Sequence, residues 1–289
     1  MRMMRCTGQC SARGWKFPEA WTAAISGFAE PVKILREQAR AINFPQRKLD
    51  RAMNLSSENP SSENPGTGKS EIPGLEIPRN WTFQKAGIAA AFDRHVREQL
   101  PWYDLATGAI AHIARHYIPT GGLVYDIGAS TGNVGRALAE TLKDRRARLV
   151  AIESAAEMIA RYDGPGEVIQ TDALAYDYER FDLGVCFLLL MFLPVSRRAA
   201  FVDRLRERIK PGGALIVFDK CEAEAGYPAT VLWRLTLAGK VSAGVDPAEI
   251  VAKELSLCGV QRPISQDVIG RDAVEWFRFG EFAGWLIEG

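Results

Sequence analysis

The sequence has few of the residues that bind metals or cross-link a fold. Its 289 residues include three histidines and five cysteines, and no two cysteines form a CxxC pair. A structural zinc site needs clustered ligands, so this spacing argues against one. Few and scattered thiols are typical of a reducing compartment, which predicts a cytoplasmic protein. The cysteines are Cys6, Cys10, Cys186, Cys221 and Cys258.

Charge of one sign and long hydrophobic runs are also scarce. The formal net charge is +1, so no overall field directs the protein to nucleic acid or to an anionic membrane. The longest apolar run, residues 183–195, contains Gly184 and Pro194 and is too short to cross a bilayer. No secretory signal is visible, because no uninterrupted apolar stretch follows the first arginines. The sequence therefore predicts a globular protein without a membrane partner.

Composition divides the chain into three parts. Residues 1–54 form a basic segment that we expect to lie outside the catalytic fold, as a basic arm, a targeting sequence or an extension upstream of a start at Met53. Residues 55–79 are rich in Ser, Glu, Asn and Pro and predict a flexible linker, because such sequence cannot bury apolar area. Residues 80–289 are the predicted folded domain.

Within that domain, apolar strands alternate with helical patterns. This alternation predicts an α/β fold with a mostly parallel sheet and helices on both faces. A pattern at residues 276–287 adds a C-terminal antiparallel hairpin around Gly280. The expected helices are residues 83–100, 104–117 (with Asp104 as N-cap), 133–143, 155–162 and 196–209; the expected strands are residues 123–127, 148–153, 167–170, 181–187 and 214–219, with a turn at 211–213.

The loop after the first strand carries the strongest motif, Asp-Ile-Gly-Ala-Ser-Thr-Gly-Asn-Val-Gly at residues 126–135. Ligands of such sheets bind at the carboxyl ends of the strands, where glycines let backbone approach them closely. A dinucleotide loop would need glycine where Ser130 and Asn133 stand, and a P-loop would end in a Lys-Ser/Thr pair. The remaining pattern, Asp-x-Gly-x-x-x-Gly, is typical of S-adenosylmethionine enzymes; a glycine-rich turn without a ligand is the alternative.

Two acidic residues strengthen this interpretation. Glu153 ends the second strand, about 20 residues past the glycines, where a carboxylate accepts hydrogen bonds from ribose hydroxyls. Asp172 follows the third strand, where we expect it to receive the adenine amino group. The sequence thus predicts an S-adenosyl-L-methionine site.

These motifs resemble the class I S-adenosylmethionine-dependent methyltransferases, which implies their Rossmann-like fold. More narrowly, residues 92–289 are similar to the carboxy-S-adenosyl-L-methionine synthase family, which supplies a carboxymethyl donor for tRNA wobble-uridine modification. Sequences that carry this likeness include Val124-Tyr125-Asp126-Ile127-Gly128-Ala129-Ser130, Ala151-Ile152-Glu153-Ser154-Ala155 and Pro211-Gly212-Gly213-Ala214-Leu215. The resemblance and the loop motif together give a predicted cofactor site of Tyr103, Asp126, Gly128, Ala129, Ser130, Gly132, Glu153, Ser154, Asp172, Ala173 and Phe187.

The chain departs from that synthase family where the donor's extra carboxylate would be read. The family has an arginine after the fifth strand, and Val241 aligns there, with Arg234 or Lys240 as substitutes. The family also has asparagine at the position of Phe187 and aspartate at that of Glu153. A carboxylated donor without a guanidinium leaves a buried charge poorly compensated, so both S-adenosylmethionine and its carboxylated form stay open.

The catalytic residues and the acceptor are not fixed by the sequence. A base is needed only if the acceptor loses a proton, and His112, His116 and His95 are the candidates, although helix histidines are more often structural. The leading hypothesis is a methyltransferase or carboxy-S-adenosylmethionine synthase-like enzyme that acts on a small molecule. The alternatives are a tRNA or DNA modification methyltransferase docked by the basic segment, and a non-catalytic S-adenosylmethionine-binding protein. We expect residues 223–258 to form a helical lid or the surface of a homodimer.

Overall fold

The computed structural model of the chain describes residues 77–222 and 225–289. These ranges leave out the basic segment 1–54, which includes Met53, and all but three residues of the expected linker. The three-part division of the chain therefore stays a prediction, and so does the role of the basic segment. Within the described residues, no helix is long and apolar enough to cross a membrane.

A seven-stranded sheet forms the centre of the domain, in the order β3-β2-β1-β4-β5-β7-β6. β1 to β5 run parallel, whereas β7 pairs antiparallel with both β5 and β6. The sheet confirms the expected mixed α/β fold with its closing hairpin. The strands are β1 (Leu123–Ile127), β2 (Arg148–Glu153), β3 (Glu167–Gln170), β4 (Phe181–Phe187), β5 (Ile209–Lys220), β6 (Val274–Phe279) and β7 (Phe282–Glu288).

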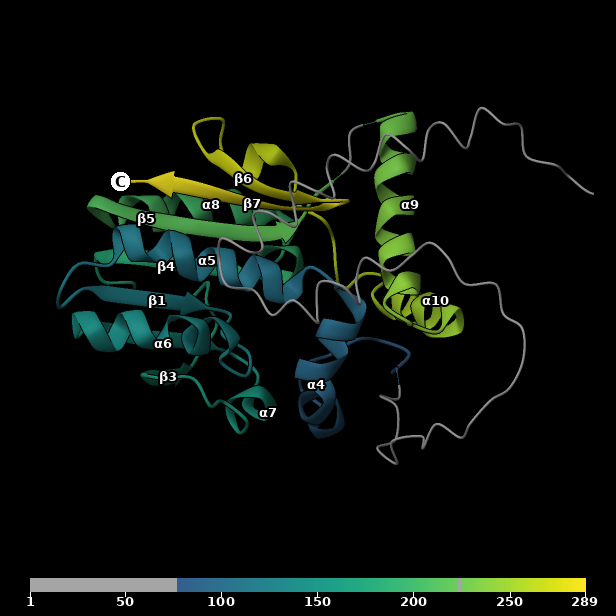
Figure 1. The fold of residues 1–289 in the computed structure, drawn as a ribbon, viewed down its shortest axis with the longest axis horizontal. Coiled ribbons are helices and arrows are strands. Elements are labelled where there is room, and N and C mark those ends of the chain that lie inside the picture. The colour runs from purple at the N-terminus through teal and green to yellow at the C-terminus, as the bar shows by residue number, and fades with distance from the viewer. Residues whose placement is uncertain (1–76, 223–224) are drawn as a thin grey trace, which may run out of the picture. The chain divides into compact units, whose positions relative to one another are not determined.

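Helices cover both faces of this sheet, since its strands are apolar on both sides. α5 (Tyr103–Tyr117) and α6 (Asn133–Arg145) pack on the face to which Val124 points, and α8 (Val195–Glu207) packs on the face of its neighbour Tyr125. Figure 1 shows α5 and α6 in front of the sheet and α8 behind it. Because both faces are buried, the polar groups that could bind a ligand are left to the strand ends.

Four further helices lie beyond the carboxyl ends of the parallel strands, toward which the arrow of β1 points in Figure 1. They are α4 (Ala86–Gln99), α7 (Ala156–Ile159), α9 (Tyr227–Ser242) and α10 (Pro247–Ser256). The Trp81 amide donates to the Ser256 carbonyl over 2.9 Å, which ties the segment before α4 to α10. α9 also leaves large apolar side chains exposed, among them Trp233. The expected homodimer surface at residues 223–258 stays a prediction.

Several expected boundaries were wrong. α4 begins at Ala86 rather than residue 83, α5 has Trp102 rather than Asp104 at its N-cap position, and the helix expected at 155–162 is the four-residue α7. The expected turn at 211–213 lies inside β5. There the register jumps from Phe181–Ile209 to Leu183–Ala214, so the extra residues form a bulge and the strand continues.

Candidate active site

The glycine loop lies between the end of β1 and the start of α6. Gly128 and Ala129 both donate their amides to the Ile152 carbonyl of β2, over 2.8 and 3.0 Å. Gly128 has φ 79°, and a Cβ there would come within 2.9 Å of the Leu189 side chain. Ser130 is also left-handed, with φ 52°. The loop is therefore a tight cradle whose backbone faces a cavity at the end of the sheet.

The Glu153 carboxylate joins this loop to the end of β2. One of its oxygens accepts from the Ser130 amide and the other from the Ser154 and Ala155 amides, all over 2.8 Å. These backbone bonds fix the carboxylate at the cavity wall and leave lone pairs for a ligand's hydroxyl groups. Asp172 also lines the cavity and accepts from the Leu174 amide over 2.9 Å.

Asp126 is the buried carboxyl group beneath the loop. Asp126 lines the cavity, and its buried Oδ2 atom has no hydrogen-bond partner among the described residues. Burial raises the pKa of Asp126 to about 7, the Gly135 amide opposes that rise, and the Glu153 charge adds to it. A buried acidic oxygen without a partner fits a cationic ligand, and S-adenosylmethionine carries both an ammonium and a sulfonium.

Gly132 is the one residue of the predicted cofactor site that does not line the cavity. Its φ is 93°, and a Cβ there would lie 2.7 Å from the Gly164 amide nitrogen. Gly132 therefore allows close packing of two backbone segments at the start of α6, and its predicted role at the cofactor stays a prediction. The other ten predicted residues line one cavity of about 450 Å³. Whether they bind the cofactor stays a prediction.

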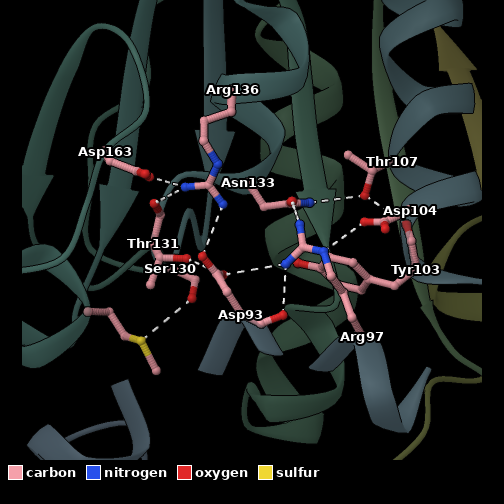
Figure 2. A network of polar contacts seen from close by, with 11 residues as sticks. Asp93, Arg97, Tyr103, Asp104, Thr107, Ser130, Thr131, Asn133, Arg136 and Asp163 are labelled. Atoms are coloured by element: carbon pink, nitrogen blue, oxygen red, sulfur yellow. Dashed lines mark hydrogen bonds and ion pairs between the residues drawn. The ribbon is translucent and has the colours of Figure 1, made fainter. Parts of the chain in front are cut away.

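A polar network connects α4 to the glycine loop (Figure 2). Arg97 donates to the Asp104 carboxylate over 2.8 Å and to Asn133 Oδ1 over 2.9 Å. Thr131 donates its hydroxyl to the Asp93 carboxylate over 2.7 Å, and Arg136 forms an ion pair with the same carboxylate. Helix α4 is thus held over the loop by side chains from α4, α5 and α6.

Aromatic side chains form much of the remaining cavity wall. Tyr103 is buried, its ring centroid lies 5.2 Å from that of Phe187, and burial raises its pKa. Phe83 makes edge-to-face contacts with Phe92 and Phe192 at 6.0 and 5.1 Å. Such a wall suits a flat apolar group next to the cofactor.

Three lysines also line the cavity, and two of them, Lys220 and Lys253, were not singled out from the sequence. Lys220 at the end of β5, Lys240 on α9 and Lys253 on α10 all line the cavity. Of the three positions considered for reading a carboxylate, Lys240 lies at the cavity, whereas Arg234 and Val241 are exposed and do not line it. Lys240 forms an ion pair with Glu254 at 2.9 Å.

The three histidines separate into two environments. His112 and His116 are exposed on α5, with ring centroids 5.8 Å apart, and do not line the cavity. His95 on α4 is buried, lines the cavity and stacks on Trp81 at 5.7 Å. Gln99, one turn further along α4, was missed by the sequence reasoning. Its position on the buried face of an amphipathic helix was the available signal.

Comparisons with known proteins agree with this geometry. Residues 124–213 match the family model described as a methyltransferase domain. The carboxy-S-adenosyl-L-methionine synthase of Staphylococcus epidermidis is 24% identical over 220 residues, covering 72% of this chain and 96% of the relative. The Wolinella succinogenes protein of that name is 29% identical over 196 residues, covering 65% and 81%. A solved structure of human N-acetylserotonin methyltransferase with S-adenosylmethionine covers 71% of this chain and 57% of its own, at 11% identity and TM-score 0.47.

Residues 124–213 carry a methyltransferase domain, and the cofactor that the domain and the relatives support is S-adenosylmethionine. The chain is similar to proteins named carboxy-S-adenosyl-L-methionine synthase, at 24–29% identity for the two relatives above. The predicted class and the predicted cofactor are confirmed.

Proposed function

We propose that the protein transfers a group from S-adenosylmethionine to a small molecule bound inside the cavity. One observation carries this proposal. The cavity is continuous from the glycine loop to the aromatic residues and lysines of α4, α9 and α10. Its volume of about 450 Å³ is in the range of small-molecule sites. Helices that surround the acceptor also exclude water from the transfer, which requires mainly alignment of the nucleophile with the methyl–sulfur bond.

The test is transfer of a deuterated methyl group from labelled S-adenosylmethionine. The full chain is incubated with the donor and with either a small-molecule extract or an RNA fraction, and the products are identified by mass spectrometry. Label in a small molecule supports the proposal. Label only in RNA would replace it with the nucleic-acid alternative, and no transfer despite donor binding would leave a non-catalytic binding protein.

A carboxylated donor is the second candidate, and the position of Lys240 favours it. In this interpretation, Lys240 reads the extra carboxylate in place of the arginine of the synthase family. The Glu254 carboxylate already pairs with Lys240, so the donor would compete for that ammonium. Native mass spectrometry of the purified protein separates the two donors, because the carboxylated form is heavier by one carboxyl group. Release of unmodified S-adenosylmethionine or its demethylated product alone would reject this candidate.

A further inference from the structure

Two buried polar atoms on α4 point to the chemistry of the acceptor. His95 Nε2 and Gln99 Oε1 have no hydrogen-bond partner among the described residues, and both side chains line the cavity. Their residues are four apart on one helix, so they lie on the same face, one turn from each other. A buried polar atom without a partner costs free energy, and such atoms in a cavity wall suggest a ligand that completes them.

A single carboxylate on α10, that of Glu249, lies beside both side chains. Gln99 donates its amide nitrogen to Glu249 Oε1 over 2.9 Å, and His95 Nδ1 lies 3.5 Å from the same oxygen. If the Gln99 amide were flipped, its oxygen would face Glu249 Oε1 and the two oxygens would repel each other. The amide nitrogen therefore faces Glu249, and Gln99 Oε1 is the atom left for a ligand. A carboxylate beside Nδ1 favours the proton on Nδ1, which leaves a lone pair on Nε2. These two atoms can each accept a hydrogen bond from a ligand. A ligand that completes both therefore needs two hydrogen-bond donors.

The charges around His95 and Gln99 restrict the chemistry of the ligand further. Burial lowers the pKa of His95 to about 3, and the charges of Lys253, Lys240 and Arg94 lower it further, so the imidazole is neutral. Lys253 lies against the Trp81 ring and makes no hydrogen bond to any described residue. Burial and the charge of Lys240 lower its pKa to about 6, although Glu254 and Glu249 oppose this. A carboxylate ligand would favour the charged form of Lys253 and would raise the proton affinity of His95, whereas an ammonium ligand would disfavour both.

We propose that the acceptor is an aromatic acid with two hydroxyl groups, that His95 Nε2 takes the proton of the reacting hydroxyl, and that Gln99 Oε1 binds the second hydroxyl. The ring lies among the aromatic residues of the wall and the carboxylate lies at Lys253. This inference rests on the proposed function. The hydroxyl oxygen forms a bond to the methyl carbon, and the sulfur–methyl bond breaks with its electron pair left on sulfur. The hydroxyl proton moves to His95 and then to water.

Nitrogen NMR on the full chain tests the binding geometry. The chain has only three histidines, so ¹⁵N-imidazole spectra contain three ring systems, which His112→Ala and His116→Ala assign. With S-adenosylhomocysteine bound, we expect His95 to carry its proton on Nδ1. Protocatechuate should shift the Nε2 resonance toward the hydrogen-bonded range, and its dimethyl ether, veratrate, should not. A proton on Nε2, no shift with protocatechuate, or equal shifts with both acids would overturn the inference.

Turnover separates a catalytic His95 from a structural one. We expect methylation of protocatechuate by the His95→Gln variant to fall about 100-fold or more in kcat, as for loss of a general base. The residual rate should rise with pH as the hydroxyl ionises in solvent, a recovery that a purely structural role would not produce. His116→Ala is the matched control and should keep the full rate. Calorimetry with S-adenosylhomocysteine on the same samples distinguishes failure of the proposed function from failure of this inference. No binding rejects the proposed function, whereas binding with an unchanged rate in His95→Gln rejects only this inference.

Discussion

The two ends of the cavity differ in how completely their polar groups are paired. At the sheet end, Glu153 and Asp172 accept backbone hydrogen bonds, and Asp126 Oδ2 is the unpartnered exception. At the helical end, His95 Nε2 and Gln99 Oε1 lack partners. A site whose groups are held before the ligand arrives needs little reorganisation, whereas a site with open acceptors is completed by its ligand. The comparison thus distinguishes the proposed site of the methyl donor, which is preformed, from the proposed site of the methyl acceptor, which the substrate completes.

The largest expected effect is a pH dependence of stability that comes from the buried Asp126 at the sheet end of the cavity. Asp126 in the folded protein has a pKa of about 7, above its usual 3.8, because of burial. Between these values the folded protein binds more protons than the unfolded chain, so the free energy of unfolding falls as pH rises from 4 to 7. Asp126→Asn should remove up to about 4 kcal/mol of this fall, measured by urea unfolding. Asp203→Asn, on the exposed side of α8, should leave the slope unchanged.

Glu153→Ala tests the donor end directly. The variant loses the carboxylate that would accept two ribose hydrogen bonds, so affinity for S-adenosylhomocysteine should fall about 100-fold. Isothermal titration calorimetry measures this, at a temperature where both proteins are folded. Glu157→Ala on α7, outside the cavity lining, is the control. Equal affinities for Glu153→Ala and the unmodified protein would remove this residue from the cofactor site.

Lys253→Met tests the helical end and should stabilise the protein. The pKa of Lys253 is lowered from 10.5 to about 6, mainly by burial, so the unfolded chain binds the extra proton between these values. Stability from this group therefore rises with pH from 6 to 10.5, and its cost is largest below pH 6. Methionine removes that cost, for a gain of about 2 kcal/mol at pH 7. Thermal unfolding measures this gain, with Lys143→Met at an exposed position as the control. Equal melting temperatures for the two variants would contradict the prediction.

The smallest expected effect concerns the connection between the two ends. Arg97→Ala breaks the bonds to Asp104 and Asn133 and should reduce stability by about 1 kcal/mol. Hydrogen exchange should increase first in α4, because the helix loses its connection to the glycine loop. An increase spread evenly over the sheet would mean that the network does not couple the two ends.

The strands and the glycine loop at the sheet end of the cavity could be predicted from the sequence, because their determinants are local. The bounds of β1 to β4 matched expectation, since each is a short apolar run between turn residues, and the loop motif occupies ten consecutive positions. The bulge in β5 was missed because its Pro-Gly-Gly sequence also suits a turn. There, the Asp182 carboxylate accepts from Lys210 over 2.8 Å and from the Leu123 amide over 2.7 Å, and these tertiary contacts keep the strand paired.

The acceptor end could not be predicted, because it depends on contacts between distant segments. Gln99 and Glu249 are 150 residues apart in the chain, and neither belongs to a motif. No sequence pattern distinguished His95 from the other two histidines. Burial distinguishes it, and burial is set by the packing of α4 against α10. Gly132 shows what a motif leaves out, since its close approach to the backbone of Gly164 also depends on tertiary packing.

The position of β7 has a consequence for the order in which the chain folds during synthesis. β7 lies between β5 and β6 in the sheet, yet it follows both of them in the chain and so leaves the ribosome after them. Until it emerges, one edge of β5 remains unpaired and can bind other nascent chains. The strands that carry the glycine loop can pair before then. The glycine loop can therefore form on a growing chain while the sheet still has an open edge, and a ligand that binds this folded part would stabilise that intermediate.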